Sequence, residues 1–161
     1  MAAHPVLWLP RSRCWSDSGA GGRLRDRERH SYLDEAVRRC VDIRKLAPSL
    51  YMFLCAYLDV SEETAKFRAA RRLWAKILTG MYGMPEERAR MRIFCSTPGG
   101  ALTAQQPHNN IIRAAHEPLA AALGSVQILA TSSWNEVHSL PSSGAAHPAL
   151  RTQRILAFEP G

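Results

Sequence analysis

Amide and imidazole side chains gather in residues 103–110, which read TAQQPHNN and directly precede the apolar run IIRAAHEPLAAALG. Two kinds of chemistry fit this cluster. Asn109 or Asn110 could satisfy the unpaired N–H groups at the start of a helix, with Pro107 stiffening the approach. Gln105 and its neighbours could instead bind a polar ligand, because loops that follow strands in α/β proteins carry ligand-binding residues. We expect the segment to serve both roles.

Other chemistry-bearing residues form weaker patterns. Cys95 ends an apolar segment near His108, which would permit a thiol–imidazole pair, although a strand cysteine is more often a small core residue. The four cysteines form no CxxC pair and the six histidines complete no zinc pattern, so we assign no metal site and no catalytic residue. The sequence contains no GxGxxG, GxxxxGK[ST] or GxSxG motif, so the common nucleotide and hydrolase fingerprints are absent.

Three apolar segments, each followed by a loop and a helical pattern, must position these residues. Strand, loop and helix in repeated succession are typical of parallel βαβ units, and the loops after the strands form the ligand face. The strands are expected to centre at Phe53, Ile93 and Ile128, and the helices at Leu73, Ala115 and Ile155.

The predicted helices carry two further expectations. The first helix should begin after Ser61 and bury one apolar stripe. That stripe consists of Phe67, Ala70, Trp74, Ile77 and Met81. The second helix contains Pro118, and a proline in a helix interior removes a hydrogen bond and clashes with the preceding turn, so we expect a kink or local break there.

Length and composition limit the function classes. A chain of 161 residues with 46% hydrophobic residues fits one main globular domain. The net charge of +7 comes from basic residues spread along the chain, which favours a solvated basic surface over a nucleic-acid site. The longest apolar stretch, LYMFLCAYL, is too short to span a membrane. We therefore expect a cytoplasmic protein with reduced thiols.

Residues 1–30 differ from the rest because they mix Pro, Gly, Ser and Arg without helical or strand periodicity. We expect a disordered extension. An organelle transit peptide is the alternative, although Asp17, Asp26 and Glu28 argue against it.

Several motifs together resemble one family. AKFRAARRLWAKI, LTAQQPHNN, LAAALG, SLP and ALRTQRILA occur in the same order and spacing as in the cobalamin-dependent acyl-CoA mutases. The resemblance is to the catalytic domains of methylmalonyl-CoA, isobutyryl-CoA and 2-hydroxyisobutyryl-CoA mutases. The resemblance runs from about Asp34 to the end of the chain. It implies an α/β fold for residues 31–161, namely three consecutive strand–helix units of a TIM (β/α)8 barrel, and leaves residues 1–30 unmatched.

The resemblance also implies a function. The family's enzymes are isomerases, or intramolecular transferases, that rearrange the carbon skeleton of an acyl-CoA by radical chemistry with adenosylcobalamin. A separate cobalamin domain supplies the histidine that ligates cobalt. This chain has no counterpart of that domain or of the upstream tyrosine–histidine segment, so we expect the isolated chain to be inactive. Its expected partners are an acyl-CoA and another mutase subunit, or the remaining barrel and cobalamin domain, with no nucleic acid and no membrane.

Candidate ligand-facing residues follow from the same resemblance. Where the family reads like LRFHTQTAG, this chain has MRIFCSTPG and keeps Arg92, a forked cation suited to a phosphate or carboxylate. An ion pair with Glu86 or Glu87 is the alternative role for Arg92. Gln127 and Thr131 persist in VQILATSSWNEVHSLP, where the family reads like TQSLHTNSYDEALALP. The predicted substrate- or cofactor-facing set is Arg92, Gln105, Gln127 and Thr131.

Several substitutions in these motifs fall at strand ends on the ligand face. Phe94 and Ala130 stand where the family has histidine. Ser96 replaces glutamine, and Ser132 replaces asparagine. His108 replaces the tyrosine of the family's AQQPYNN.

A second function class stays open. Three barrel units leave two open sheet edges, and exposed edges demand a partner. The chain could therefore be a non-catalytic interaction protein or a subunit remnant that pairs with another mutase chain. A basic nucleic-acid binder is the third and weakest possibility, because no recognised motif or aromatic platform supports it.

Overall fold

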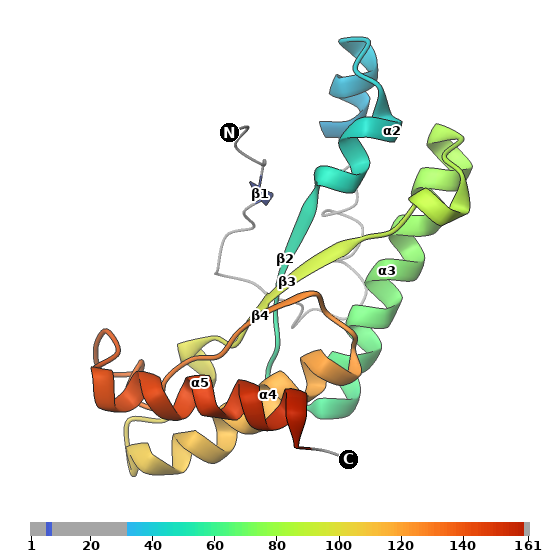
Figure 1. Cartoon of the computed structure of the whole chain (residues 1–161). Coiled ribbons are helices and arrows are strands. Elements are labelled where there is room, and N and C mark those ends of the chain that lie inside the picture. The colour runs from blue at the N-terminus through green and yellow to red at the C-terminus, as the bar shows by residue number, and fades with distance from the viewer. Residues whose placement is uncertain (1–5, 8–31, 160–161) are drawn as a thin grey trace. The chain divides into compact units, whose positions relative to one another are not determined.

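The computed structural model describes residues 6–7 and 32–159, and its main elements alternate between strand and helix (Figure 1). All six predicted element centres fall inside an element of the expected type. The strands are β2 (Tyr51–Cys55), β3 (Arg92–Ser96) and β4 (Ile128–Ala130), and the long helices are α3 (Val60–Tyr82), α4 (Asn110–Leu123) and α5 (Ser143–Phe158).

The strands form one sheet in the order β1-β2-β3-β4, where β1 is the short segment Val6–Leu7. β1 pairs with β2 in parallel, and β3 pairs with β4 in parallel with Phe94 opposite Ile128. The prediction of three consecutive parallel strand–helix units of a barrel-type α/β fold is thus confirmed. Apart from Val6–Leu7, the predicted disordered extension over residues 1–30 lies outside the described residues.

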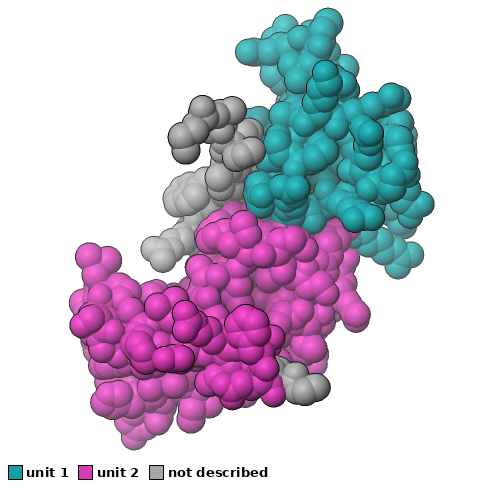
Figure 2. Space-filling view, viewed as in Figure 1, with its two compact units in different colours: residues 1–52, 72–92 teal, residues 53–71, 93–161 magenta. Residues whose placement is uncertain are grey.

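The chain divides into two compact units, which Figure 2 colours teal and magenta. The first comprises the described residues of 1–52 together with 72–92. It contains a helical turn over residues 32–38, the short helix α2 (Ile43–Leu46), and the second half of α3. Within it, the Tyr82 hydroxyl donates to Asp34 Oδ1 at 2.7 Å. Its buried apolar residues include Leu33, Leu50, Trp74, Leu78, Met84 and Met91.

The second unit comprises residues 53–71 and 93–161. Here α4 and α5 lie side by side (Figure 1). The first half of α3 contacts α4 through Thr64, whose hydroxyl donates to the Ala120 carbonyl. Arg71 donates from α3 to the Gly124 and Ser125 carbonyls and so satisfies the carboxyl end of α4. The buried apolar side chains include Phe67, Ile93, Cys95, Leu102, Ala114, Ala120 and Ala121.

Two local expectations are wrong, and one of the two alternatives at Pro118 is excluded. Met81 is 63% exposed, so the buried stripe on α3 ends at Leu78 and does not include Met81. The helix begins at Val60 rather than after Ser61, because Asp59 Oδ1 accepts the Glu62 N–H at 2.9 Å and caps the first turn. α4 continues through Pro118 without a local break, and the proline ring is fully buried; the expected kink stays a prediction.

No helix in the described part of the chain is long and apolar enough to cross a membrane.

Candidate ligand-facing strand ends

The carboxyl ends of β3 and β4 are joined by a polar bridge. The Thr97 N–H donates to the Ala130 carbonyl at 3.0 Å, and the Ser132 N–H donates to Thr97 Oγ1 at 2.7 Å. The Ser132 hydroxyl donates in turn to the Thr97 carbonyl. Thr97 and Ser132 are both buried. This strand-end bridge, Thr97 with Ser132, fixes the loops that follow β3 and β4 relative to each other.

Asn110 ties the segment TAQQPHNN to the loop after β4. The side chain is fully buried. Its Nδ2 donates to the Thr103 carbonyl at 2.8 Å and to the Trp134 carbonyl at 3.0 Å, while Oδ1 accepts the Thr103 N–H at 3.1 Å. Both Nδ2 and Oδ1 of Asn110 therefore have hydrogen-bond partners in these loops. Asn110 is a structural link between two ligand-facing loops.

The helix-capping prediction for this segment is wrong. Asn109 occupies the N-cap position of α4, but its side chain makes no capping bond and donates to Gln106 Oε1 at 2.9 Å. The cause lies in the 3-10 helix Pro107–Asn109, which runs directly into α4. Its carbonyls already accept the Asn110 N–H, so this first helical amide needs no side-chain cap.

Two histidines also link the loop after β3 to the loop after β4. The His108 ring packs against Trp134 with 4.7 Å between ring centroids and a 48° tilt. His138 Nε2 lies 3.2 Å from the Ala104 carbonyl oxygen. Both imidazoles therefore contribute to loop–loop contacts.

The structure favours the core role for Cys95 over a thiol–imidazole pair. The side chain is fully buried, and burial raises the pKa of the thiol to about 12, although Lys66 partly offsets that rise. A thiol with so high a pKa is a poor nucleophile at neutral pH. His108, the proposed base, packs on Trp134 instead.

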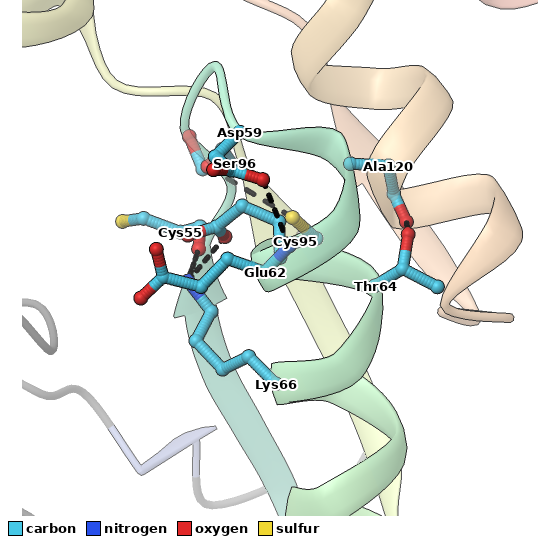
Figure 3. Close-up of polar contacts among 9 residues, drawn as sticks. Cys55, Asp59, Glu62, Thr64, Lys66, Cys95, Ser96 and Ala120 are labelled. Carbon is cyan, nitrogen blue, oxygen red and sulfur yellow. Dashed lines mark hydrogen bonds and ion pairs between the residues drawn. The ribbon is translucent and has the colours of Figure 1, made fainter. Parts of the chain in front are cut away.

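A buried ion pair that we did not predict, Glu63 with Lys66, lies close to the carboxyl end of β2. Lys66 is 5% exposed and donates from Nζ to the Glu63 carboxylate and to the Cys55 carbonyl, the latter at 2.8 Å. Figure 3 shows Lys66 extending from α3 toward the end of β2. The Phe67 ring lies 5.4 Å from Nζ. The spacing of three residues between Glu63 and Lys66 on a helix was the available signal.

Glu117 was also missed. It is fully buried on α4, and neither carboxylate oxygen has a protein hydrogen-bond partner. Burial raises the pKa of Glu117 to about 8, and the Thr97 side chain beside it partly offsets that rise. The helical spacing of Asn110, Ala114 and Glu117 on one buried face was the signal in the sequence. His116, in contrast, is exposed.

Two of the four predicted ligand-facing residues belong to the amino ends of strands. Arg92 begins β3 and is exposed; its Nη1 donates to the Tyr51 hydroxyl at 3.0 Å, and its guanidinium lies 5.6 Å from the centre of the Tyr51 ring. Among the described residues, no ion pair joins Arg92 to Glu86 or Glu87. Gln127 directly precedes β4, where its Oε1 accepts the Ile93 N–H at 2.8 Å.

The other two residues follow their strands. Gln105 is exposed in the loop between β3 and α4. Thr131 directly follows β4, and its buried hydroxyl has no protein hydrogen-bond partner. Because ligand-facing loops lie at the carboxyl ends of parallel strands, Gln105 and Thr131 occupy the expected end. The binding roles of all four residues remain predictions.

The Phe94 substitution produces an aromatic contact on β3. Its ring stacks on Phe53 of β2, with 4.9 Å between centroids and 18° between the ring planes. An imidazole at this position would offer a hydrogen-bonding group, whereas the phenyl ring adds an apolar surface.

Comparisons with known proteins agree with the resemblance. The family model described as methylmalonyl-CoA mutase matches residues 27–161. The 2-hydroxyisobutanoyl-CoA mutase large subunit of Aquincola tertiaricarbonis is 37% identical over 132 residues, which cover 81% of this chain and 24% of that protein. The mitochondrial methylmalonyl-CoA mutase of Homo sapiens is 39% identical over 131 residues, and that of Escherichia coli (strain K12) is 36% identical over 128. The chain spans 18% of the length of each of these two mutases.

Proposed function

Because the chain belongs to the methylmalonyl-CoA mutase family, we propose that it forms one wall of a barrel that binds an acyl-CoA. The observation that carries the proposal is the combination of the family match with three parallel strand–helix units in the expected order. The hydrogen bonds that join the loop after β3 to the loop after β4 also support the proposal, because a ligand-binding edge needs loops held in fixed positions.

In this proposal, Gln105 and Thr131 face the ligand at the carboxyl ends of the strands. Gln105 is free to do so because it is exposed, and the Thr131 hydroxyl lacks a protein partner. Arg92, supported on the Tyr51 ring, would hold a phosphate or carboxylate. Gln127 would act by holding β4 against β3, because its amide already bonds the Ile93 N–H and the Ser125 carbonyl.

The resemblance implies adenosylcobalamin as cofactor, and this group supplies radical chemistry when bound to a complete mutase. The described residues do not by themselves fit a cobalt site. Cobalt in this family takes one protein histidine, so the loop histidines are the groups to consider among the described residues. Of the loop histidines, His108 packs on Trp134 and His138 contacts the Ala104 carbonyl. We therefore assign no cofactor ligand among the described residues.

The chain alone should not catalyse isomerisation. It spans only 18–24% of the length of the relatives described above. The positioning of substrate against a reactive group contributes much of the rate in enzymes, and such positioning needs residues from all around the site. Incubation of the purified chain with adenosylcobalamin and either methylmalonyl-CoA or 2-hydroxyisobutanoyl-CoA should yield no isomerised product. Measurable turnover would show that the site is more complete than proposed.

A non-catalytic role in pairing with another mutase chain is the second candidate. It is favoured by apolar side chains that remain uncovered in the second unit: Leu140 is 89% exposed, Phe158 is 84% exposed, and Ile128 on the edge strand β4 is 41% exposed. Co-purification with a relative from which the matched segment has been deleted would support pairing. In that mixture, recovered turnover would support the barrel-wall proposal, and binding without turnover would support the non-catalytic role.

A further inference from the structure

Glu117 is a buried carboxyl group that the proposed function does not use. It lies on α4, with its side chain fully buried and both oxygens without a protein partner. An ionised carboxylate in such surroundings is strongly destabilising unless it is paired with a cation or hydrogen-bonded. The groups around Glu117 therefore determine whether the native state holds it charged or neutral.

Among the described residues, no free cation faces Glu117 from the neighbouring elements. On α3, Lys66 is engaged by the Glu63 carboxylate and the Cys55 carbonyl. The loop after β4 contributes Glu136, and the negative charges of Glu63 and Glu136 disfavour a further negative charge at Glu117. On β3, Cys95 is a neutral thiol, because burial raises its pKa to about 12.

The remaining titratable groups on the helices are directed elsewhere. On α4, Arg113 donates to Asn110 Oδ1 at 3.0 Å, and His116 is exposed, with Nδ1 2.9 Å from the Ile112 carbonyl oxygen. On α5, which packs beside α4, and at the residue that follows it, the titratable side chains are exposed; they are His147, Arg151, Arg154 and Glu159.

Thr97 connects Glu117 to the strand-end bridge. Thr97 lies close enough to Glu117 to affect its proton affinity. The same threonine hydroxyl accepts the Ser132 N–H at 2.7 Å, and Thr97 also pairs with Ala130 through its backbone N–H. A change of charge at Glu117 therefore acts directly on the residue that joins the ends of β3 and β4.

We propose that Glu117 is a protonated latch, which packs neutral against Thr97 in the native state and opens α4 from the strand-end bridge when it ionises. The driving force is the hydration of the carboxylate, which the closed packing does not provide. Opening would separate the loops that carry Gln105 and Thr131, so ligand binding at this edge would weaken at alkaline pH.

The direction of the pH dependence follows from the burial. The pKa of Glu117 rises from 4.5 to about 8 on folding, so the native state retains a proton that the unfolded chain has released. Glu117 does not reduce the free energy of unfolding below about pH 4.5. As the pH rises from there toward about 8, the free energy of unfolding decreases through this group. Over that window the folding equilibrium constant should fall about tenfold per pH unit through this one group.

Carboxyl-carbon NMR of the intact wild-type chain is the first test. The Glu117 carboxyl resonance should titrate with a midpoint near 8, and the Ser132 amide resonance should shift with the same midpoint. A Glu117 midpoint near 4.5 would overturn the proposal, as would a Ser132 amide that does not respond. This test needs no variant, so it stands even if substitutions at Glu117 prevent folding.

Urea unfolding at a series of pH values is the second test. Glu117→Gln keeps the shape of the side chain without its charge, so the tenfold loss per pH unit should disappear in this variant relative to wild type. All other ionisable groups are common to both proteins, so their contributions cancel in the comparison. Glu87→Gln, at an exposed position, is the matched control and should retain the wild-type slope. An unchanged slope in Glu117→Gln would contradict the latch.

Discussion

Gly124 ends α4 directly against the ring of Phe67 on α3. A Cβ atom on Gly124 would lie 2.7 Å from Phe67 Cδ2 and 2.8 Å from Phe67 Cβ, closer than carbon atoms pack. The carbonyl oxygen of Gly124 also accepts a hydrogen bond from Arg71. The absence of a side chain at Gly124 thus allows the end of α4 to approach α3.

Gly124→Ala should therefore destabilise the protein by about 1–3 kcal/mol, because the fully buried Phe67 ring has little room to move. The measurement is the free energy of unfolding in urea. Gly80→Ala is the matched control: nothing lies within 4 Å of a Cβ there, and the residue sits inside α3. That control should stabilise the chain by about 0.5–1 kcal/mol through helix propensity. Equal changes in the free energy of unfolding for Gly124→Ala and Gly80→Ala would rule out the close approach of Gly124 to Phe67.

Asn110→Ala should destabilise the fold by about 2–4 kcal/mol, because it removes a fully buried side chain and leaves partly buried backbone groups of Thr103 and Trp134 without partners. Gln105→Ala in the same loop should stay within about 0.5 kcal/mol, since that side chain is exposed. Thermal or urea unfolding of the two variants gives the comparison. A larger loss for Gln105→Ala than for Asn110→Ala would reverse the assignment of structural and ligand-facing amides.

Lys66→Met should cost about 3–5 kcal/mol, because it leaves the Glu63 carboxylate buried and unpaired. Adding Glu63→Gln to that variant removes the unpaired charge and should recover part of the loss. Lys76→Met on the exposed side of α3 is the control and should change the unfolding free energy little. If the double variant were no more stable than Lys66→Met, the ion pair would not be the source of the loss.

The sequence predicted the main elements well because each has a strong local signal. Apolar segments around Phe53 and Ile93 and the helical stripe from Phe67 to Ile77 depend on periodicity, which tertiary packing here reinforces. The local break considered at Pro118 is absent, because burial of the ring favours continuation of the helix there.

The interior of the candidate site was harder to predict. Asn110 was interpreted as a helix cap because its partners on Thr103 and Trp134 become neighbours only when the two loops fold together. Glu117 and Lys66 were missed because charged residues are usually solvated, and only the packing of α3 and α4 on the strands shows that both are buried. Long-range contacts of this kind leave little trace in a single sequence.

The central claim is that residues 31–161 form a wall of an acyl-CoA mutase barrel, and a chimera tests it most directly. In that chimera, the matched segment of the 2-hydroxyisobutanoyl-CoA mutase large subunit is replaced by residues 31–161 of this chain. We predict a cooperatively folding protein that still binds acyl-CoA, measured by calorimetric titration with 2-hydroxyisobutanoyl-CoA. Reduced turnover would agree with the substitutions at Phe94, Ser96 and Ala130. A chimera that fails to fold, or folds without binding acyl-CoA, would contradict the claim.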